Sequence, residues 1–256
     1  MKKKVLAFGC HPDDVEFMCS GTLALLAGKG WEVHIAVMAG GEMGSPSLAP
    51  QSIRAKRLKE AETAAAVIGA HFHHAGGYDI EVEYNADYRR RAVRIMRAVD
   101  PALVFAPPPA DYLIDHEETS RLVRNAAFIA PAPNYDCGVP TKPTSRIPYL
   151  YYWNAVGLRD IFGRPLPLTL AVNIVSVMKT KTRMLKCHAS QRAWLRYISG
   201  WDEYIKVMQG MASEEGQRAG IPAAEGFIQH VGSGHPRDNI LKKTLGNLCV
   251  ELVASE

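Results

Sequence analysis

Apolar runs and amphipathic stretches alternate along the first half of the chain. Short apolar runs, each bounded by polar or turn-forming residues, predict buried strands at 5–9, 32–39, 70–74 and 102–106. Helical spacing and glycine stops predict helices at 15–27, 53–68, 85–99 and 115–129. Strands that alternate with helices at this spacing are typical of β-α-β units, whose strands run parallel in one sheet.

The pattern becomes less regular after residue 130. Five prolines between 131 and 148 predict a long ordered loop. Beyond the loop, the pattern predicts strands at 147–153 and 168–177 and helices at 178–197 and 202–217. We therefore expect one α/β domain over residues 1–256. Its Rossmann-like three-layer core, with a mostly parallel central sheet, covers 1–130, and an irregular C-terminal cap covers 131–256.

Composition narrows the class of protein. Hydrophobic residues make up 47 % of the chain and charged residues 22 %, as in ordinary globular proteins. No apolar run is long enough for a membrane helix, so we expect no membrane insertion. A net charge of +4 is too small to indicate a nucleic-acid partner. Five cysteines without CxxC spacing fit reduced thiols, which favours a cytoplasmic location.

Two loops that leave strand ends are rich in metal-binding side chains. His11-Pro12-Asp13-Asp14 follows the first strand, and a second segment, 111–116, follows the strand at 102–106. Ligand sites of parallel sheets lie beyond the carboxyl ends of the strands. A hydrolytic zinc site needs about three histidine or carboxylate ligands, and a nearby carboxylate can act as its base.

Each loop also has a simpler interpretation. Asp13 or Asp14 could cap the first helix, because a carboxylate accepts hydrogen bonds from its free N–H groups. Asp115 and Glu118 have the spacing of a capping box, which would leave His116 as an ordinary first-turn residue. The pairing of two such clusters at one edge of a sheet favours the metal site.

These residues resemble the zinc-dependent LmbE-like, or PIG-L, family of de-N-acetylases. The family includes the N-acetylglucosaminyl-phosphatidylinositol, mycothiol-pathway and bacillithiol-pathway deacetylases. The resemblance extends beyond the first loop and covers residues 5 to about 191. Its further motifs are Gly41-Glu42, Arg57-x-x-Glu60, the aspartate in Gly76-Gly77-Tyr78-Asp79, and His188-x-Ser190-Gln191.

The resemblance implies a role for each matching residue. His11, Asp14 and His116 would bind one Zn²⁺ per chain, and Asp13 would act as the general base. Substrate contacts would come from Arg57, Asp79, Glu42 and Tyr112. The substrate would be a small amino sugar or its conjugate. Relatives commonly form trimers or hexamers, so a homo-oligomer is expected.

One position departs from the family pattern. Many relatives have a histidine that helps to stabilise the oxyanion where this chain has Leu113. A leucine cannot donate a hydrogen bond, so another donor must replace it, or the activity or substrate differs. His188, Tyr112 and His235 are candidate substitutes, and we predict His188 as the catalytic one. Without its usual histidine partner, Asp115 is expected only to cap its helix.

The expected function is therefore zinc-dependent removal of an acetyl group from an N-acetylated amino sugar or its conjugate, a linear amide and not a peptide bond. One alternative keeps the metal and changes the substrate to a non-sugar amide. Another is a non-catalytic sugar- or nucleotide-binding α/β module, although the chain lacks a glycine fingerprint for nucleotides.

Two further clusters have simpler interpretations. His71 and His73 share one face of a predicted strand and His74 lies on the other, so a site of all three is improbable and a surface role is expected. Arginines at 89, 90, 91, 94 and 97 predict a solvated helix face.

Overall fold

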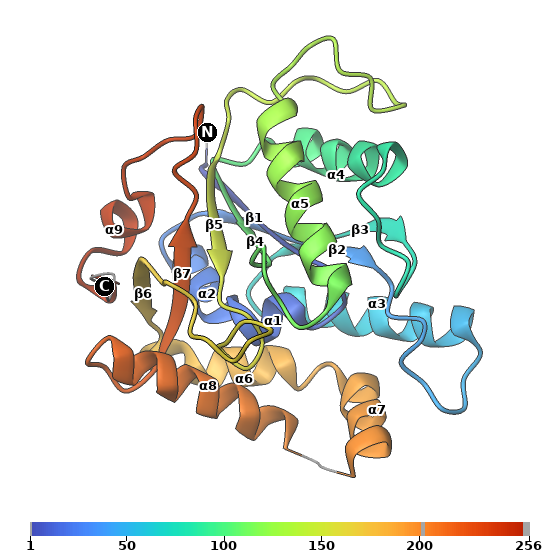
Figure 1. The fold of residues 1–256 in the computed structure, drawn as a ribbon, viewed down its shortest axis with the longest axis vertical. Helices are drawn as coiled ribbons and strands as arrows, with labels where there is room; N and C mark the ends of the chain where they lie inside the picture. The colour runs from blue at the N-terminus through green and yellow to red at the C-terminus, as the bar shows by residue number, and fades with distance from the viewer. Residues whose placement is uncertain (1, 201–202, 253–256) are drawn as a thin grey trace.

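The computed structural model describes residues 2–200 and 203–252. In those residues eight strands form one sheet with the order β3-β2-β1-β4-β5-β7-β6-β8 (Figure 1). The strands are β1 (Lys4–Gly9), β2 (Glu32–Ala39), β3 (His71–Gly77), β4 (Leu103–Ala106), β5 (Tyr149–Trp153), β6 (Leu170–Asn173), β7 (Ala224–Gln229) and β8 (Cys249–Glu251). The predicted α/β class is confirmed.

The first five strands form the parallel part of the sheet. β1 lies between β2 and β4, and Val5 is in register with Val33 on one side and Leu103 on the other. β4 and β5 also pair in parallel. The apolar runs of β1, β2, β4 and β5 are buried on both faces, as is usual in parallel sheets, whereas the edge strand β3 is only partly buried. The far edge is antiparallel, because β7 pairs with β5 and β6, and β8 with β6.

Helices cover both faces of the sheet and produce three layers (Figure 1). On one face, α4 and α5 pack over an apolar cluster that includes Phe8 and Val104. On the other face, α2, α3, α6 and α9 cover a cluster that includes Phe105 and Phe227. Their bounds are α2 (Ser20–Gly28), α3 (Pro50–Ala66), α4 (Ala86–Val99), α5 (Ile114–Ile129), α6 (Met178–Leu185) and α9 (Ile240–Leu245).

The predicted helix at 15–27 is two helices, α1 (Asp14–Met18) and α2, separated at Cys19. The start of α2 is held from the C-terminal half of the chain. Glu225 of β7 accepts hydrogen bonds from the backbone N–H groups of Gly21 at 2.8 Å and Thr22 at 2.6 Å. Lys181 of α6 donates to the same carboxylate at 2.6 Å. The C-terminal half of the chain is thus bonded to the helical segment that directly follows the loop of His11, Asp13 and Asp14.

The C-terminal half differs from its prediction in several places. The expected helix at 178–197 is interrupted before Ala189, and α7 (Ala189–Ser199) follows α6 in a new direction (Figure 1). α8 (Tyr204–Arg218) begins at Tyr204, and residues 201 and 202 of the expected helix lie outside the described residues. The predicted strand at 168–177 is shorter and ends in a 3-10 turn (Val175–Val177). The pattern did not indicate β7, β8 or α9.

Some arginines of α4 are structural, which corrects the expected solvated face in part, while Arg90 is exposed as expected. Arg97 is buried and donates to the carbonyls of Ala130 at 3.0 Å and Ala132 at 2.6 Å. Arg94 donates to the carbonyl of Cys137 at 2.6 Å. These bonds fix the proline-rich loop against the core. Among the described helices, none has the length and apolar character needed to span a membrane.

Candidate metal centre and its pocket

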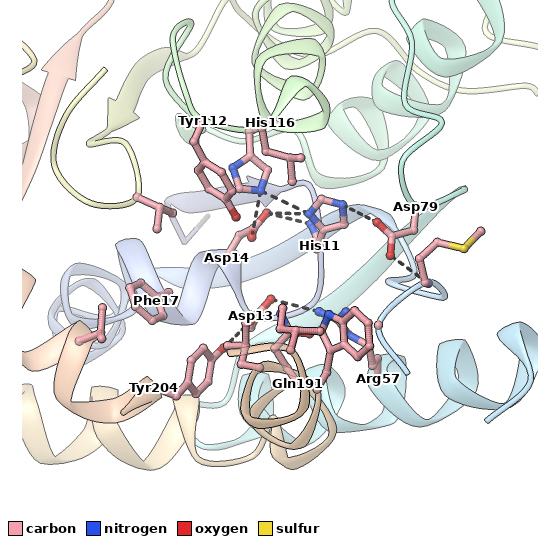
Figure 2. Close-up of a pocket in the computed structure, with 18 of the residues that line it drawn as sticks. His11, Asp13, Asp14, Phe17, Arg57, Asp79, Tyr112, His116, Gln191 and Tyr204 are labelled. Atoms are coloured by element: carbon pink, nitrogen blue, oxygen red, sulfur yellow. Dashed lines mark hydrogen bonds and ion pairs between the residues drawn. The ribbon is translucent and has the colours of Figure 1, made fainter. Parts of the chain in front are cut away.

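The three predicted ligands meet beyond the carboxyl ends of β1 and β4. His11 and Asp14 come from the turn after β1, and His116 from the first turn of α5. Nδ1 of His11 lies 3.3 Å from Nε2 of His116. Carboxylate oxygens of Asp14 lie 3.9 Å from the former nitrogen and 3.5 Å from the latter. One ligand atom from each residue therefore faces a shared point (Figure 2).

The donor set fits a metal ion. Two imidazoles and one carboxylate leave a position open, as in hydrolytic zinc sites. Metal-binding histidines usually donate their second ring N–H to a carboxylate, which fixes the ring. Here Nε2 of His11 lies 2.9 Å from Asp79, and Nδ1 of His116 lies 3.2 Å from Asp111. Each ring is thus oriented by a carboxylate at the nitrogen that does not face the metal position.

The carboxylate of Asp14 is held in the charged form. Its Oδ2 accepts hydrogen bonds from the backbone N–H groups of Cys10 and His11, both at 2.8 Å. Burial opposes the charge, but His116 and His11 outweigh it, and the pKa of Asp14 falls below its usual value. A charged carboxylate at this position suits a cation.

Asp13 faces away from the three ligands. Its backbone lies in the left-handed region with φ 113°, which turns its side chain opposite to that of Asp14 (Figure 2). One carboxylate oxygen lies 3.3 Å from Arg57, and the other accepts a hydrogen bond from the hydroxyl of Tyr204. Burial raises the pKa of Asp13, against the opposing charge of Arg57. Neither Asp13 nor Asp14 makes a side-chain cap to α1.

Asp115 does not cap α5, which corrects the sequence interpretation. The capping position belongs to Leu113, and no side-chain cap is made. Asp115 instead accepts from the backbone N–H of Ile80 at 2.8 Å and lies 3.3 Å from Nε2 of His11. It therefore orients the same ring as Asp79 and connects α5 to the loop after β3.

Arg57 of α3 is fixed by groups of the protein. Its guanidinium donates to the carbonyls of Pro12 at 2.8 Å and Gly41 at 3.3 Å, besides Asp13. A Cβ at Gly41 would lie 2.5 Å from the guanidinium, so the close approach requires glycine there. Arg57 lines the pocket, but its described bonds brace the loop of Asp13.

The other predicted substrate residues differ in position. Tyr112 lines the pocket, is 63 % exposed, and meets the ring of His116 edge-on. Asp79 also lines it. Glu42 is buried, is bonded to Arg54 at 3.3 Å, and is not among the described lining residues.

His188 lies behind the pocket. It is 1 % exposed, its Nε2 lies 3.4 Å from Glu16, and it is absent from the described pocket lining. The structure thus places His188 beside Glu16 and not among the described lining residues, and its direct catalytic role stays a prediction. The rest of its motif anchors α7, because Ser190 donates its N–H and hydroxyl to Glu60 of α3.

The three candidate ligands, His11, Asp14 and His116, lie at one end of a cavity of about 610 Å³. The opposite wall is apolar and comes from α1, the loop after β5, α7 and α8. Its described members are Phe17, Val156, Trp194, Leu195, Ile198 and Val207. Tyr204, which bonds to Asp13, is a site residue that sequence reasoning missed. Its only signal was its place in an amphipathic helix, and such a position is usually occupied by a core residue.

Comparison with known proteins agrees with this geometry. Residues 6–127 match the family model described as PIG-L, GlcNAc-PI de-N-acetylase. A diacetylchitobiose deacetylase of Thermococcus kodakarensis is 27 % identical, over 84 % of this chain and 82 % of that protein. A 4-oxalmesaconate hydratase of Pseudomonas putida is 24 % identical, over 89 % of this chain and 86 % of that protein.

A solved structure also superposes on the chain. The N,N'-diacetylchitobiose deacetylase of Pyrococcus horikoshii, complexed with its inhibitor MPG, is 26 % identical with a TM-score of 0.76. The match covers 89 % of this chain and 84 % of that one. The matching residues contain His11, Asp13, Asp14 and His116, so the motif and its surrounding fold are similar together. Residues 6–127 of this chain are thus similar to the PIG-L, or LmbE-like, family, and the resemblance expected from the sequence is confirmed over that segment.

Proposed function

We propose that this protein is a zinc-dependent hydrolase that removes the acetyl group from an N-acetylated amino sugar or its conjugate. One observation carries the proposal: a His-Asp-His cluster and a separate, buried carboxylate, Asp13, lie at the same end of one cavity. The family match and the deacetylase relatives support the same reaction. The bond broken is the amide between the acetyl carbon and the sugar nitrogen.

His11, Asp14 and His116 would hold one zinc ion per chain. When bound, zinc lowers the pKa of water and polarises a carbonyl oxygen. The chain keeps both ligand rings in place through Asp79, Asp115 and Asp111. Carboxylates behind ligating histidines fix the tautomer and make the ring more basic.

Asp13 would act as the base and then as the acid. It would accept a proton from the water that attacks the acetyl carbon, and return it to the nitrogen as the carbon–nitrogen bond breaks. Arg57 and Tyr204 hold its carboxylate from two sides, in the same cavity as the metal ligands but turned away from the metal itself. Burial raises its pKa toward the range useful for proton transfer.

We assign the missing oxyanion donor to Tyr112. Leu113 lines the cavity, but its side chain has no hydrogen-bond donor. Of the three candidate substitutes, His188 lies behind the pocket, and His235 is buried at the carbonyl of Pro148. Of these three candidates, Tyr112 alone is among the described lining residues of the cavity, and its ring contacts His116. A hydroxyl beside the metal ligands can donate to the oxygen that becomes negative.

The lining favours a neutral substrate with an apolar portion. Among the described lining residues Arg57 is the only arginine or lysine, and protein groups already occupy it. This argues against the anionic polycarboxylate that the name of the hydratase relative implies. The apolar wall, which includes Trp194 and Val207, suits a hydrophobic group attached to the sugar. Arg57 and Asp79 line the cavity and would contact the sugar in addition to their bonds within the protein. Glu42 would not contact the sugar directly.

The family resemblance also leads us to propose a cytoplasmic homo-oligomer, a trimer or hexamer. Exposed apolar side chains such as Ile161 and Phe162 could form part of a contact between copies. Light scattering coupled to size-exclusion chromatography tests this state.

Acetate release tests the substrate class. Zinc-loaded protein should release acetate from N,N'-diacetylchitobiose and from N-acetylglucosaminides, and faster from those with an alkyl or aryl aglycone. Simple N-alkylacetamides should react more slowly, because they cannot fill the cavity. Faster turnover of the simple amides would favour the non-sugar alternative. Binding without any acetate release would favour the non-catalytic module.

A further inference from the structure

A second group of metal-binding side chains lies at the other end of the sheet. β2 and β3 pair in parallel with His34 opposite His71. Side chains alternate along a strand, so Glu32 and His34 of β2 share a face with His71 and His73 of β3. Glu32 and His71 are the first residues of their strands. The strand length places this group roughly 20 Å from the proposed catalytic metal, beyond the opposite ends of the strands.

The side chains of this group already converge. Ligand atoms of Glu32, His34 and His71 lie within 4.8 Å of one another. Nε2 of His34 is 2.9 Å from a carboxylate oxygen of Glu32, and its Nδ1 is 2.9 Å from Nε2 of His73. The rings of His34 and His71 stack with centroids 4.9 Å apart.

We propose that Glu32, His34 and His71 bind a second divalent cation of the zinc class, with His73 orienting the ring of His34. Two imidazoles and one carboxylate suit Zn²⁺ and its neighbours Co²⁺ and Ni²⁺ better than Mg²⁺ or Ca²⁺, which prefer oxygen ligands. Nδ1 of His34 bonds to His73, so the metal would take Nε2 in place of the hydrogen bond that this nitrogen now makes with Glu32, and the bond to His73 would fix the tautomer.

Charge and exposure at this site are compatible with metal entry. His71 is exposed and Glu32 half-buried, so the site opens to solvent. Lys4 lies 3.7 Å from Glu32 and is the competing cation. Its long side chain is free to turn outward when a metal binds.

The cation would fix an edge strand. β3 is the terminal strand of the sheet and carries the loop with Asp79 and Ile80, both of which reach the catalytic cluster. A metal that links the start of β3 to β2 would stabilise the folded state, because it binds the folded pairing only. The predicted surface role of His71 and His73 thus becomes a structural metal site, while His74 on the other face stays outside it.

Zinc content measured on single variants tests the site. Tag-free protein is stripped with chelator, equilibrated with buffered free zinc near neutral pH, and analysed for bound metal. His71→Ala should bind about one zinc per chain less than the wild type. His74→Ala is the matched control, since it removes a histidine from the other face of the same strand, and it should keep the wild-type content.

Two further variants make the test specific. His73→Ala should lower the affinity of this site for zinc about 10-fold or more, as loss of a residue that hydrogen-bonds a metal ligand does. Lys4→Gln should raise the affinity, because it removes the competing cation. The measured quantity is a difference between variants, so it does not depend on occupancy of the His11 cluster. Equal zinc content in His71→Ala, His74→Ala and wild type would overturn the proposal, whatever the catalytic site does.

Discussion

At the scale of single residues, two adjacent aspartates have different environments. Asp14 faces the two histidines, and Asp13 faces Arg57 and Tyr204. The sequence predicted both as chemically important, because carboxylates and a histidine follow a strand end. It could not separate them from helix caps, since the residue that holds the Asp13 carboxylate, Arg57, lies 44 positions away.

Asp13→Asn should abolish turnover and keep the metal. The amide cannot accept the proton of water, so the turnover number should fall at least about 100-fold, the usual worth of a general base. Acetate release and zinc content are measured on the same sample. Asp14→Asn is the control that should lose zinc. Unchanged activity in Asp13→Asn would remove the proposed base.

Tyr112→Phe should lower the turnover number about 100-fold with little change in zinc content, because it removes one donor to the oxyanion. Leu113→His should partly restore the rate in the Tyr112→Phe background, since it returns the histidine that relatives carry. Steady-state kinetics of the two single variants and the double variant measure the coupling. A Tyr112→Phe variant with wild-type kinetics would mean that the donor lies elsewhere.

At the scale of elements, helix α3 joins the two halves of the site. Arg57 holds the loop of Asp13, and Glu60, one turn later, caps α7 at Ser190. The Arg-x-x-Glu spacing was readable in the sequence, and so was the helix. The interruption between α6 and α7 was not, because the helical pattern is continuous through Cys187 and the cap comes from a distant helix.

Glu60→Gln should loosen α7. Replacing a charged cap by a neutral one should cost about 1 kcal/mol of the free energy of unfolding. Because α7 carries Gln191 and Trp194 into the pocket, KM should rise more than the turnover number falls. Urea unfolding and steady-state kinetics measure the two effects.

Glu62→Gln is the matched control for Glu60→Gln. Glu62 lies on the same helix, is exposed, and pairs with Lys59. It should leave KM and stability unchanged within about 0.5 kcal/mol. If both variants behave alike, the cap at Ser190 does not position α7.

At the scale of the molecule, the parallel half of the sheet was predictable and the antiparallel half was not. β1 to β4 follow from the local alternation of strands and helices, because only a few sheet topologies are compatible with such a pattern. β7 pairs with β5 across 76 positions in the chain, as in Tyr152 with Ile228, and no short pattern specifies that. For the same reason, the buried charges that join the cap to the core could not be foreseen.

Glu215 should make stability depend on pH. It lies buried in α8, accepts from Asn154 and from the N–H of Gly226, and burial raises its pKa to about 7. The folded state thus holds the proton more tightly than the unfolded state. Its stabilising contribution is complete below the unfolded pKa near 4.5 and is lost as the pH rises through about 7.

Urea unfolding of wild type and Glu215→Gln between pH 5 and 8 measures this loss. The wild type should lose about 3 kcal/mol relative to the variant over that range. Glu214→Gln is the control, because Glu214 is exposed beside Glu215 and pairs with Arg159. Parallel curves for wild type and Glu215→Gln would show that Glu215 titrates normally.

The most direct test of the whole account is the metal dependence of acetate release from an N-acetylated amino sugar. Protein stripped of metal should release no acetate from N,N'-diacetylchitobiose, and added zinc should restore release as the cluster of His11, Asp14 and His116 fills. His116→Ala, measured in parallel, should bind about one zinc less and stay inactive at any zinc concentration that the wild type tolerates. Release that persists in the stripped protein, or in His116→Ala, would contradict the account.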